Sequence, residues 1–333
     1  LMNDSENTSE KVFVRTLSLD DLKDNLIPSL LNSNFIDSIC DEAFIDDAGD
    51  KKLKPNYISN ELEILLSQTM LRSVALPIEF STPFGSLKQR KDNPKYNTFE
   101  HFVLSHFKLD YDDKNPLHKD FYLPFDPFND SKNINLLKLT TKATGAFRIG
   151  LRFREFFNNE FTVDYIKNNS RKLLYNKIMP RNIPVNPIIQ FQGVNNPFDF
   201  VGIDGGAINN EPIGEVLNVL KERYGEKQEG EYDKYALIMI DPFPDHLYIK
   251  EYKQPKDIFS AIPSILGTLQ DQAKVKRREM LEFHIKKYFR GEIYPVRYKN
   301  NDELEEHHIA CSSAFAFGGF LDINFRHHDF FLG

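Results

Sequence analysis

Apolar residues recur along the chain in two patterns, one typical of amphipathic helices and one typical of strands. Apolar side chains at helical spacing predict mainly helix over Val12–Ile45 and a further helix over Glu61–Leu71. A strand is predicted over Val74–Ser81, and His101–Phe107 fits either a strand or a short helix. We therefore expect one domain over residues 1–333, mainly helical over residues 1–72 and containing the sheet over residues 73–333.

The second half of the chain has the pattern of a strand, a helix and a second strand. Phe198–Ile203 is a short apolar run with one polar interruption, and Tyr235–Ile240 is an uninterrupted one that predicts a strand buried on both faces. Between them, Asn210 is placed to cap a helix that continues to Tyr224. This order indicates a right-handed crossover, and hence an α/β fold with a central, mostly parallel sheet flanked by helices.

Composition narrows the class of protein. The sequence has a net charge of −7, which argues against a protein dedicated to nucleic-acid binding. It lacks an apolar run long enough for a membrane-spanning helix, and its first residues lack a signal-peptide pattern. Its two cysteines, Cys40 and Cys311, cannot form a disulfide framework, so we expect a reducing, cytoplasmic location. The 29 Phe and 14 Tyr without Trp point to a Phe-rich core or binding surface.

Asp204, Gly205 and Gly206 are the main candidates for chemistry. They follow the predicted strand Phe198–Ile203, and ligands of open parallel sheets bind at the carboxyl ends of strands. A carboxylate at that position can act as a general base, orient a nucleophile or bind a metal. The two glycines allow the backbone to approach a ligand or another loop closely. Because turns also use Asp and Gly most, a plain turn is the alternative.

The segment Phe200–Pro212, FVGIDGGAINNEP, resembles the signature around the catalytic aspartate of the patatin-like phospholipase family. Further segments resemble that family in the same order: Ala143–Gly150, Ile238–Pro244, Phe317–Asp322 and Phe325–Phe330. The likeness extends from about Leu17 to Gly333. It implies a patatin-like fold of three layers and a serine acyl hydrolase that uses a Ser-Asp dyad.

By this resemblance Asp204 is the dyad acid, and Gly205, Gly206, Asn209 and Asn210 shape the site. The family's nucleophile lies in a G-x-S-x-G turn, but no serine of this sequence has glycine two residues before and two after it. The family's glycine-rich oxyanion loop is missing too. We therefore expect an N-terminal truncation, with the serine supplied by a preceding segment or by another polypeptide.

Two hypotheses about function follow. In the first, the parent protein is a phospholipase A-like lipid acyl hydrolase that needs no cofactor or metal and acts on phospholipids or other acyl lipids. In the alternative, the chain is a non-catalytic remnant, or a module of the same fold that binds lipid or a partner. Under either hypothesis, a cytoplasmic protein could also contact a membrane surface. The basis is a basic run at Lys274–Arg278 that is followed by Lys286, Lys287 and Arg290. A solvated helix face explains that run equally.

Two other groups of residues have competing explanations. His307, His308 and Cys311, and separately His327, His328 and Asp329, contain metal-ligand types, but adjacent residues do not point at one ion, so we expect no metal site. The aromatic segments Phe121–Phe128 and Phe153–Phe157 suit either an acyl-chain groove or core packing beneath a loop.

Overall fold

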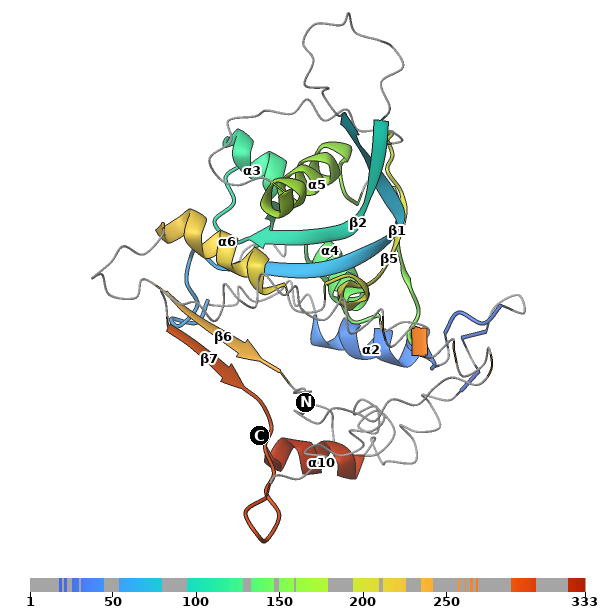
Figure 1. The fold of residues 1–333 in the computed structure, drawn as a ribbon, viewed down its shortest axis with the longest axis vertical. Helices are drawn as coiled ribbons and strands as arrows, with labels where there is room; N and C mark the ends of the chain where they lie inside the picture. The colour runs from blue at the N-terminus through green and yellow to red at the C-terminus, as the bar shows by residue number, and fades with distance from the viewer. Residues whose placement is uncertain are drawn as a thin grey trace, which may run out of the picture. The chain divides into compact units, whose positions relative to one another are not determined.

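The structure is a computed structural model, shown in Figure 1. It describes residues 18–19, 21–22, 26–29, 31–44, 54–79, 95–127, 133–146, 150–158, 160–178, 194–209, 212–225, 235–241, 257, 261, 264–265, 268, 289–303 and 323–332. The chain divides into two compact units, Leu1–Ile36 with Pro212–Gly333, and Asp37–Glu211. The single domain expected from the sequence over residues 1–333 stays a prediction. Within the described residues, no helix has the length and apolar character needed to cross a membrane.

The unit of residues 37–211 contains a five-stranded sheet. In the order in which they pair, its strands are β3 (Leu123–Pro124), β2 (Lys95–Lys108), β1 (Glu63–Glu79), β5 (Phe200–Asp204) and β4 (Arg154–Phe156). β1 pairs antiparallel with β2 and with β5, β4 pairs antiparallel with β5, and β2 pairs parallel with β3. The fold is thus mixed α/β, but the described strands do not form the mostly parallel sheet that we predicted. The reason is that β1 and β2 follow one another and pair antiparallel along most of their length.

The helix predicted over Glu61–Leu71 is wrong, because β1 begins at Glu63. In the described part of residues 1–72, Ser33–Ala43 is helical and Glu63 onward is strand. Both faces of β1 carry apolar side chains: Leu66 and Met70 pack on one face, and Leu65 on the other. Two apolar faces produce a spacing that resembles a helix. Within the predicted helical stretch Val12–Ile45, α2 (Ser33–Ala43) is helical, whereas residues 18–19, 21–22 and 26–29 are not.

Helices cover both faces of this sheet (Figure 1). On one face α4 (Ile134–Thr144) packs through Leu136, Leu137 and Ala143 into the main core. That core includes aromatic rings from several elements, and the stacked pair Phe156 and Phe200 has ring centroids 4.7 Å apart. On the other face the side chains that cluster are Leu65, Phe102, Leu104, Ile208 and, from α5 (Val163–Ile178), Leu173.

Two side chains of α5 form hydrogen bonds with the backbone along the outer edge of β2. Asn169 Oδ1 accepts from the Leu104 N–H at 3.2 Å, and Asn169 Nδ2 donates to the Leu104 carbonyl at 2.7 Å. The Tyr165 hydroxyl donates to the same carbonyl at 2.9 Å and accepts from the His106 N–H at 3.0 Å. β3 pairs with β2 from Phe107 onward. The backbone groups of this edge are therefore paired by side chains where no strand pairs them.

The second unit contains α6 (Ile213–Tyr224) and the parallel pair β6 (Ala236–Ile240) and β7 (Phe289–Ile293). α6 and its end at Gly225, which has φ of 73°, agree with the sequence prediction. Its N-cap is Pro212, without a side-chain hydrogen bond, and Asn210 lies outside the described residues. Because β6 pairs with β7 and not with β5, the predicted crossover within one sheet is wrong.

The apolar run of β6 predicts a strand that is buried on both faces, but this prediction is wrong. Leu237 packs against Ile213 and Leu217 of α6, but Ile238 is 55% exposed and Ile240 is 73% exposed. The sequence also predicts a last strand over Ile293–Val296; this prediction is wrong beyond its first residue, because β7 ends at Ile293 and residues 294–296 are not in a strand. The chain also contains α3 (Pro116–Phe121) and α10 (Ile323–Leu332). The sequence further predicts one or two helices over Ile262–Phe289 and a tightly packed helix or turn over Ile309–Phe320. Most of the first range and all of the second lie outside the described residues.

Candidate functional site

Asp204 is the last residue of β5, an inner strand between β1 and β4. Its N–H donates to the Ala146 carbonyl at 3.2 Å, just beyond the C-terminal end of α4. Its carboxylate Oδ1 accepts from the Gly206 N–H at 2.8 Å and caps a short 3₁₀ turn, Gly205–Ala207. The half-buried carboxylate is therefore held in one orientation at the end of the strand, where the sequence placed it.

Position 205 requires a glycine because the turn after β5 packs closely against β1. An added Cβ would clash with Ser67 Oγ and lie 2.6 Å from the Ser67 backbone, because Ser67 of β1 lies beside the turn. The sequence left open whether the glycines admit a ligand or another part of the chain. For Gly205 it is another part of the chain, namely β1. Gly206 is buried and donates the hydrogen bond that orients Asp204.

Asn209 is the unusual residue of this turn. Its side chain is fully buried, and neither Oδ1 nor Nδ2 has a hydrogen-bond partner within the described structure. Its N–H donates to the Gly205 carbonyl at 2.9 Å, which fixes it against the turn. Thr69, opposite Ile203 on β1, is also buried, and its Oγ1 has no partner within the same residues. Two unpaired buried polar side chains therefore lie on elements that contact the Asp204 turn.

Gln68 lies opposite Asp204 on β1 and is fully buried. Its Oε1 accepts from the Ser105 hydroxyl at 3.3 Å, and its Nε2 donates to the Thr140 carbonyl at 3.5 Å. Asp204 thus lies opposite a residue whose side chain forms buried hydrogen bonds with Ser105 and Thr140. No pattern in the sequence indicated these hydrogen bonds, because Gln68 lies in a stretch predicted as helix.

A second cluster that sequence reasoning missed lies at the start of β1. Glu63 Oε2 lies 2.7 Å from His106 Nε2, and Glu63 Oε1 lies 3.1 Å from Lys108 Nζ, which also pairs with Asp110 at 2.8 Å. Burial raises the pKa of Glu63, but the hydrogen bonds and charges of His106 and Lys108 outweigh it and lower that pKa to about 2. Burial lowers the pKa of Lys108, but its two carboxylate partners raise it on balance.

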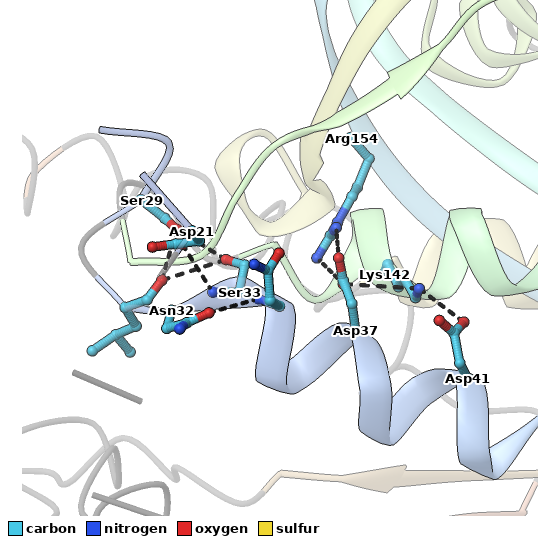
Figure 2. Close-up of polar contacts among 10 residues, drawn as sticks. Asp21, Ser29, Asn32, Ser33, Asp37, Asp41, Lys142 and Arg154 are labelled. Carbon is cyan, nitrogen blue, oxygen red and sulfur yellow. Dashed lines mark hydrogen bonds and ion pairs between the residues drawn. The ribbon is translucent and has the colours of Figure 1, made fainter. Parts of the chain in front are cut away.

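A third polar cluster joins α2, α4 and β4 (Figure 2). The Arg154 guanidinium meets the two carboxylate oxygens of Asp37 at 2.7 and 2.8 Å, and Lys142 Nζ lies 3.1 Å from Asp41. Asp37 and Asp41 are four residues apart and share one face of α2, which is the signal that could have revealed the cluster. We assign it to packing, because its charges are paired with each other.

Figure 2 also shows how α2 begins. Asn32 Oδ1 accepts from the Asn34 N–H at 2.9 Å, and Asp21 Oδ2 accepts from the Ser33 N–H at 3.3 Å. These are the side-chain acceptors that the first turn of a helix needs for its unpaired N–H groups.

The described residues contain no group of three or more potential metal ligands. In α10, His328 Nδ1 contacts Asp329 Oδ1 at 2.9 Å, and its Nε2 contacts Arg297 Nη1 at 3.2 Å, so both ring nitrogens are engaged within the protein. The other metal candidates, His307, His308 and Cys311, and the side chains of the basic run Lys274–Arg278 with Lys286, Lys287 and Arg290 lie outside the described residues.

The aromatic segments divide between the two explanations offered for them. Phe125 and Phe156 are buried in the main core, which agrees with core packing. Phe153 and Phe157 are each 40% exposed. Their alternation around Phe156 follows β4, which turns successive side chains to opposite faces of the sheet.

Comparison with known proteins leaves the family of this chain open. No protein-family model matches it, and no solved structure matches it. The chain is similar to the uncharacterized protein y4iI of Sinorhizobium fredii (strain NBRC 101917 / NGR234), with 31% identity over 147 residues. That match covers 41% of this chain and 21% of the relative, so it spans about a fifth of the relative's length. Because the relative is itself uncharacterized, the similarity assigns no activity.

Proposed function

We propose that the parent protein is a lipid acyl hydrolase in which Asp204 is the acid of a Ser-Asp dyad. The observation that carries this proposal is the position of Asp204. It ends an inner strand, and the Gly206 N–H fixes one oxygen of its carboxylate at 2.8 Å. A carboxylate held at a strand end is the arrangement that a general base requires. The likeness of Phe200–Pro212 to the patatin-like signature supports the same role.

In this proposal a serine from a segment outside this chain attacks the acyl carbonyl of the lipid ester, and Asp204 accepts the hydroxyl proton. The tetrahedral intermediate collapses to an acyl-serine, and the alcohol part leaves with the proton from Asp204. Water then attacks the acyl-serine, and Asp204 accepts a proton from the water and returns one to the serine. N–H donors of the segment that carries the serine stabilise the oxyanion.

The same proposal covers the three-layer arrangement of the fold and the place in the cell where the protein acts. The segment with the serine completes the sheet into a patatin-like fold of three layers, and the coverage of both sheet faces by α4 and α5 supports this. The substrate is a phospholipid or another acyl lipid, so the protein acts in the cytoplasm at a membrane surface. If no upstream serine exists, the chain is the non-catalytic binding module of the alternative hypothesis, which the absence of a G-x-S-x-G motif favours.

The test uses the protein encoded by the complete reading frame, assayed with a short-chain acyl ester and with phospholipid vesicles. Asp204→Asn keeps an oxygen that can accept from the Gly206 N–H but loses the base, so turnover should fall by about 100-fold or more with unchanged thermal stability. Asp164→Asn, at an exposed position of α5, is the matched control and should keep full activity. Unchanged turnover in Asp204→Asn would end the assignment.

A further inference from the structure

His118 accepts a hydrogen bond from the protein backbone. The Asp112 N–H donates to His118 Nδ1 at 2.8 Å. A backbone N–H has no lone pair, so Nδ1 must supply one and the ring proton must lie on Nε2. A protonated imidazole carries a hydrogen on both nitrogens and cannot accept this hydrogen bond. The contact between His118 and Asp112 therefore exists only while the ring is neutral.

Two other histidines of the same unit have the opposite role. His101 Nδ1 lies 2.7 Å from the Met70 carbonyl oxygen, and His106 Nε2 lies 2.7 Å from a carboxylate oxygen of Glu63. Both partners are acceptors, so both rings donate, and a protonated ring donates equally. Acid therefore breaks the described hydrogen bond of His118 but leaves those of His101 and His106 in place.

The His118 hydrogen bond joins two parts of the connection between β2 and β3. Asp112 lies in the loop that follows β2, and His118 lies in α3, which leads through Tyr122 into β3. The His118 ring contacts Tyr111 of that loop and Tyr122, whose ring centroids lie 5.6 and 5.4 Å away. The Tyr122 ring in turn lies 4.6 Å from the His106 ring. His118 thus links the loop, the helix and the start of β3.

Nearby carboxylates favour the protonated form of the His118 ring. Asp112 and Asp113 belong to the loop, and Asp120 belongs to α3. Burial, followed by the charges of Asp113 and Asp120, raises the pKa of Tyr111, so both carboxylates lie near the rings. The neutral ring has the Asp112 N–H as its partner, and a charged ring has carboxylates as alternative partners. The site therefore offers a different partner to each form of the ring.

Cations near α3 act in the opposite direction. Lys108 Nζ lies 5.4 Å from the centroid of the Tyr122 ring, but it is already paired with two carboxylates. Lys114 and Lys119 are exposed, so solvent screens their charges. α3 also packs against α5 (Figure 1), whose described charged side chains are Asp164, Lys167, Arg171 and Lys172. Charges of both signs thus surround the ring, whereas the Asp112 N–H favours only its neutral form.

We propose that His118 is a pH-sensitive switch, which holds the loop of residues 110–115 against α3 while its ring is neutral and releases the loop when the ring is protonated. Histidine is the side chain that ordinarily changes its charge between about pH 5 and 8. When the ring gains a proton, the Asp112 N–H loses its acceptor and the imidazolium pairs with the nearby carboxylates. The switch is independent of the proposed hydrolase activity, because it uses no residue of the Asp204 turn.

The test is an NMR titration of the 333-residue chain with isotope-labelled histidine. At about pH 8, His118 should carry its proton on Nε2 and His101 on Nδ1. As the pH falls to about 5 and the His118 ring is protonated, the Asp112 amide resonance should shift. Hydrogen exchange of that amide, corrected for the intrinsic effect of pH, should become about tenfold faster.

Three results of this titration would overturn the proposal. The first is a proton on His118 Nδ1 at about pH 8, because the ring would then not accept from Asp112. The second is a ring that stays neutral down to about pH 5. The third is an Asp112 amide that keeps its slow exchange after the ring is charged. Each is read from the wild-type chain and does not depend on a variant that folds.

Two variants separate the hydrogen bond from the packing of the ring. His118→Phe keeps an aromatic ring but has no acceptor, so the Asp112 amide should exchange about tenfold faster even at about pH 8, with no further corrected effect of acid. His101→Phe is the matched control, because His101 donates to Met70 and has no described contact with the loop. It should leave the exchange of the Asp112 amide and its pH dependence unchanged. Slow exchange retained in His118→Phe would also overturn the proposal.

Discussion

The outer edge of β2 and the C-terminal end of β5 belong to one sheet, but their polar groups are treated differently. At the β2 edge, Asn169 and Tyr165 form hydrogen bonds with the buried backbone groups of Leu104 and His106. At the β5 end, Asn209 is as deeply buried and has no partner in the described residues. The same residue type thus stabilises the fold in one place and costs stability in the other. The contribution of a buried asparagine to stability therefore depends on whether its amide is paired.

The largest effect is expected at the complete edge. Asn169→Leu leaves the Leu104 N–H buried without a partner and removes a hydrogen bond to the Leu104 carbonyl. We expect the free energy of unfolding to fall by about 3 kcal/mol, measured by urea denaturation. Asn168→Leu, one residue away and only partly buried, should change it by about 0.5 kcal/mol or less. A neutral Asn169→Leu would remove the contrast with Asn209.

The next effect concerns the close packing at the β5 end. Gly205→Ala places a methyl group 2.6 Å from the Ser67 backbone, so β1 or the turn must move. We expect a loss of about 2 kcal/mol in the free energy of unfolding. Gly145→Ala is the control, because its added Cβ meets the Thr141 carbonyl oxygen at an ordinary 3.6 Å. Equal effects in the two variants would contradict the close approach of β1.

The third prediction tests the charge cluster at the start of β1. The pKa of Glu63 is about 2 in the folded protein and 4.5 without its partners, so Glu63 stabilises the fold above pH 4.5. That contribution is lost as the pH falls from 4.5 toward 2. The difference between the two pKa values corresponds to about 3 kcal/mol, and we expect roughly 1–2 kcal/mol of it because solvent screens this partly solvated cluster. Glu63→Gln should flatten the dependence of stability on pH in this window. Glu42→Gln, at an exposed position of α2, should leave it unchanged.

The smallest effect is expected for Tyr165→Phe. The buried hydroxyl donates to the Leu104 carbonyl and accepts from the His106 N–H, while Asn169 still binds the same carbonyl. We expect the free energy of unfolding to fall by about 1 kcal/mol in urea denaturation. Tyr57→Phe removes a hydroxyl from a ring that is 88% exposed and should have no measurable effect. A Tyr165→Phe protein as stable as the wild type would show that Asn169 alone pairs the edge.

Predictions from the sequence were correct where interactions between residues close in the sequence determine the structure. β5 follows from an apolar run of a few residues, and α6 follows from apolar spacing with a glycine at its end. β1 was mistaken for a helix because its two apolar faces mimic helical spacing, and only its partners β2 and β5 reveal the strand. The crossover failed for a similar reason, since strand pairing joins residues distant in the chain, such as Gln68 with Asp204.

The candidate site divides in the same way. The sequence by itself determined the Asp204 turn, because an aspartate followed by two glycines can bind its own backbone two residues ahead, as Asp204 does with Gly206. Only the tertiary structure decided that Gly205 must be small, that Gln68 lies opposite Asp204, and that Asn209 is buried without a partner. Those properties depend on the register of β1 against β5, which no local pattern of residues encodes.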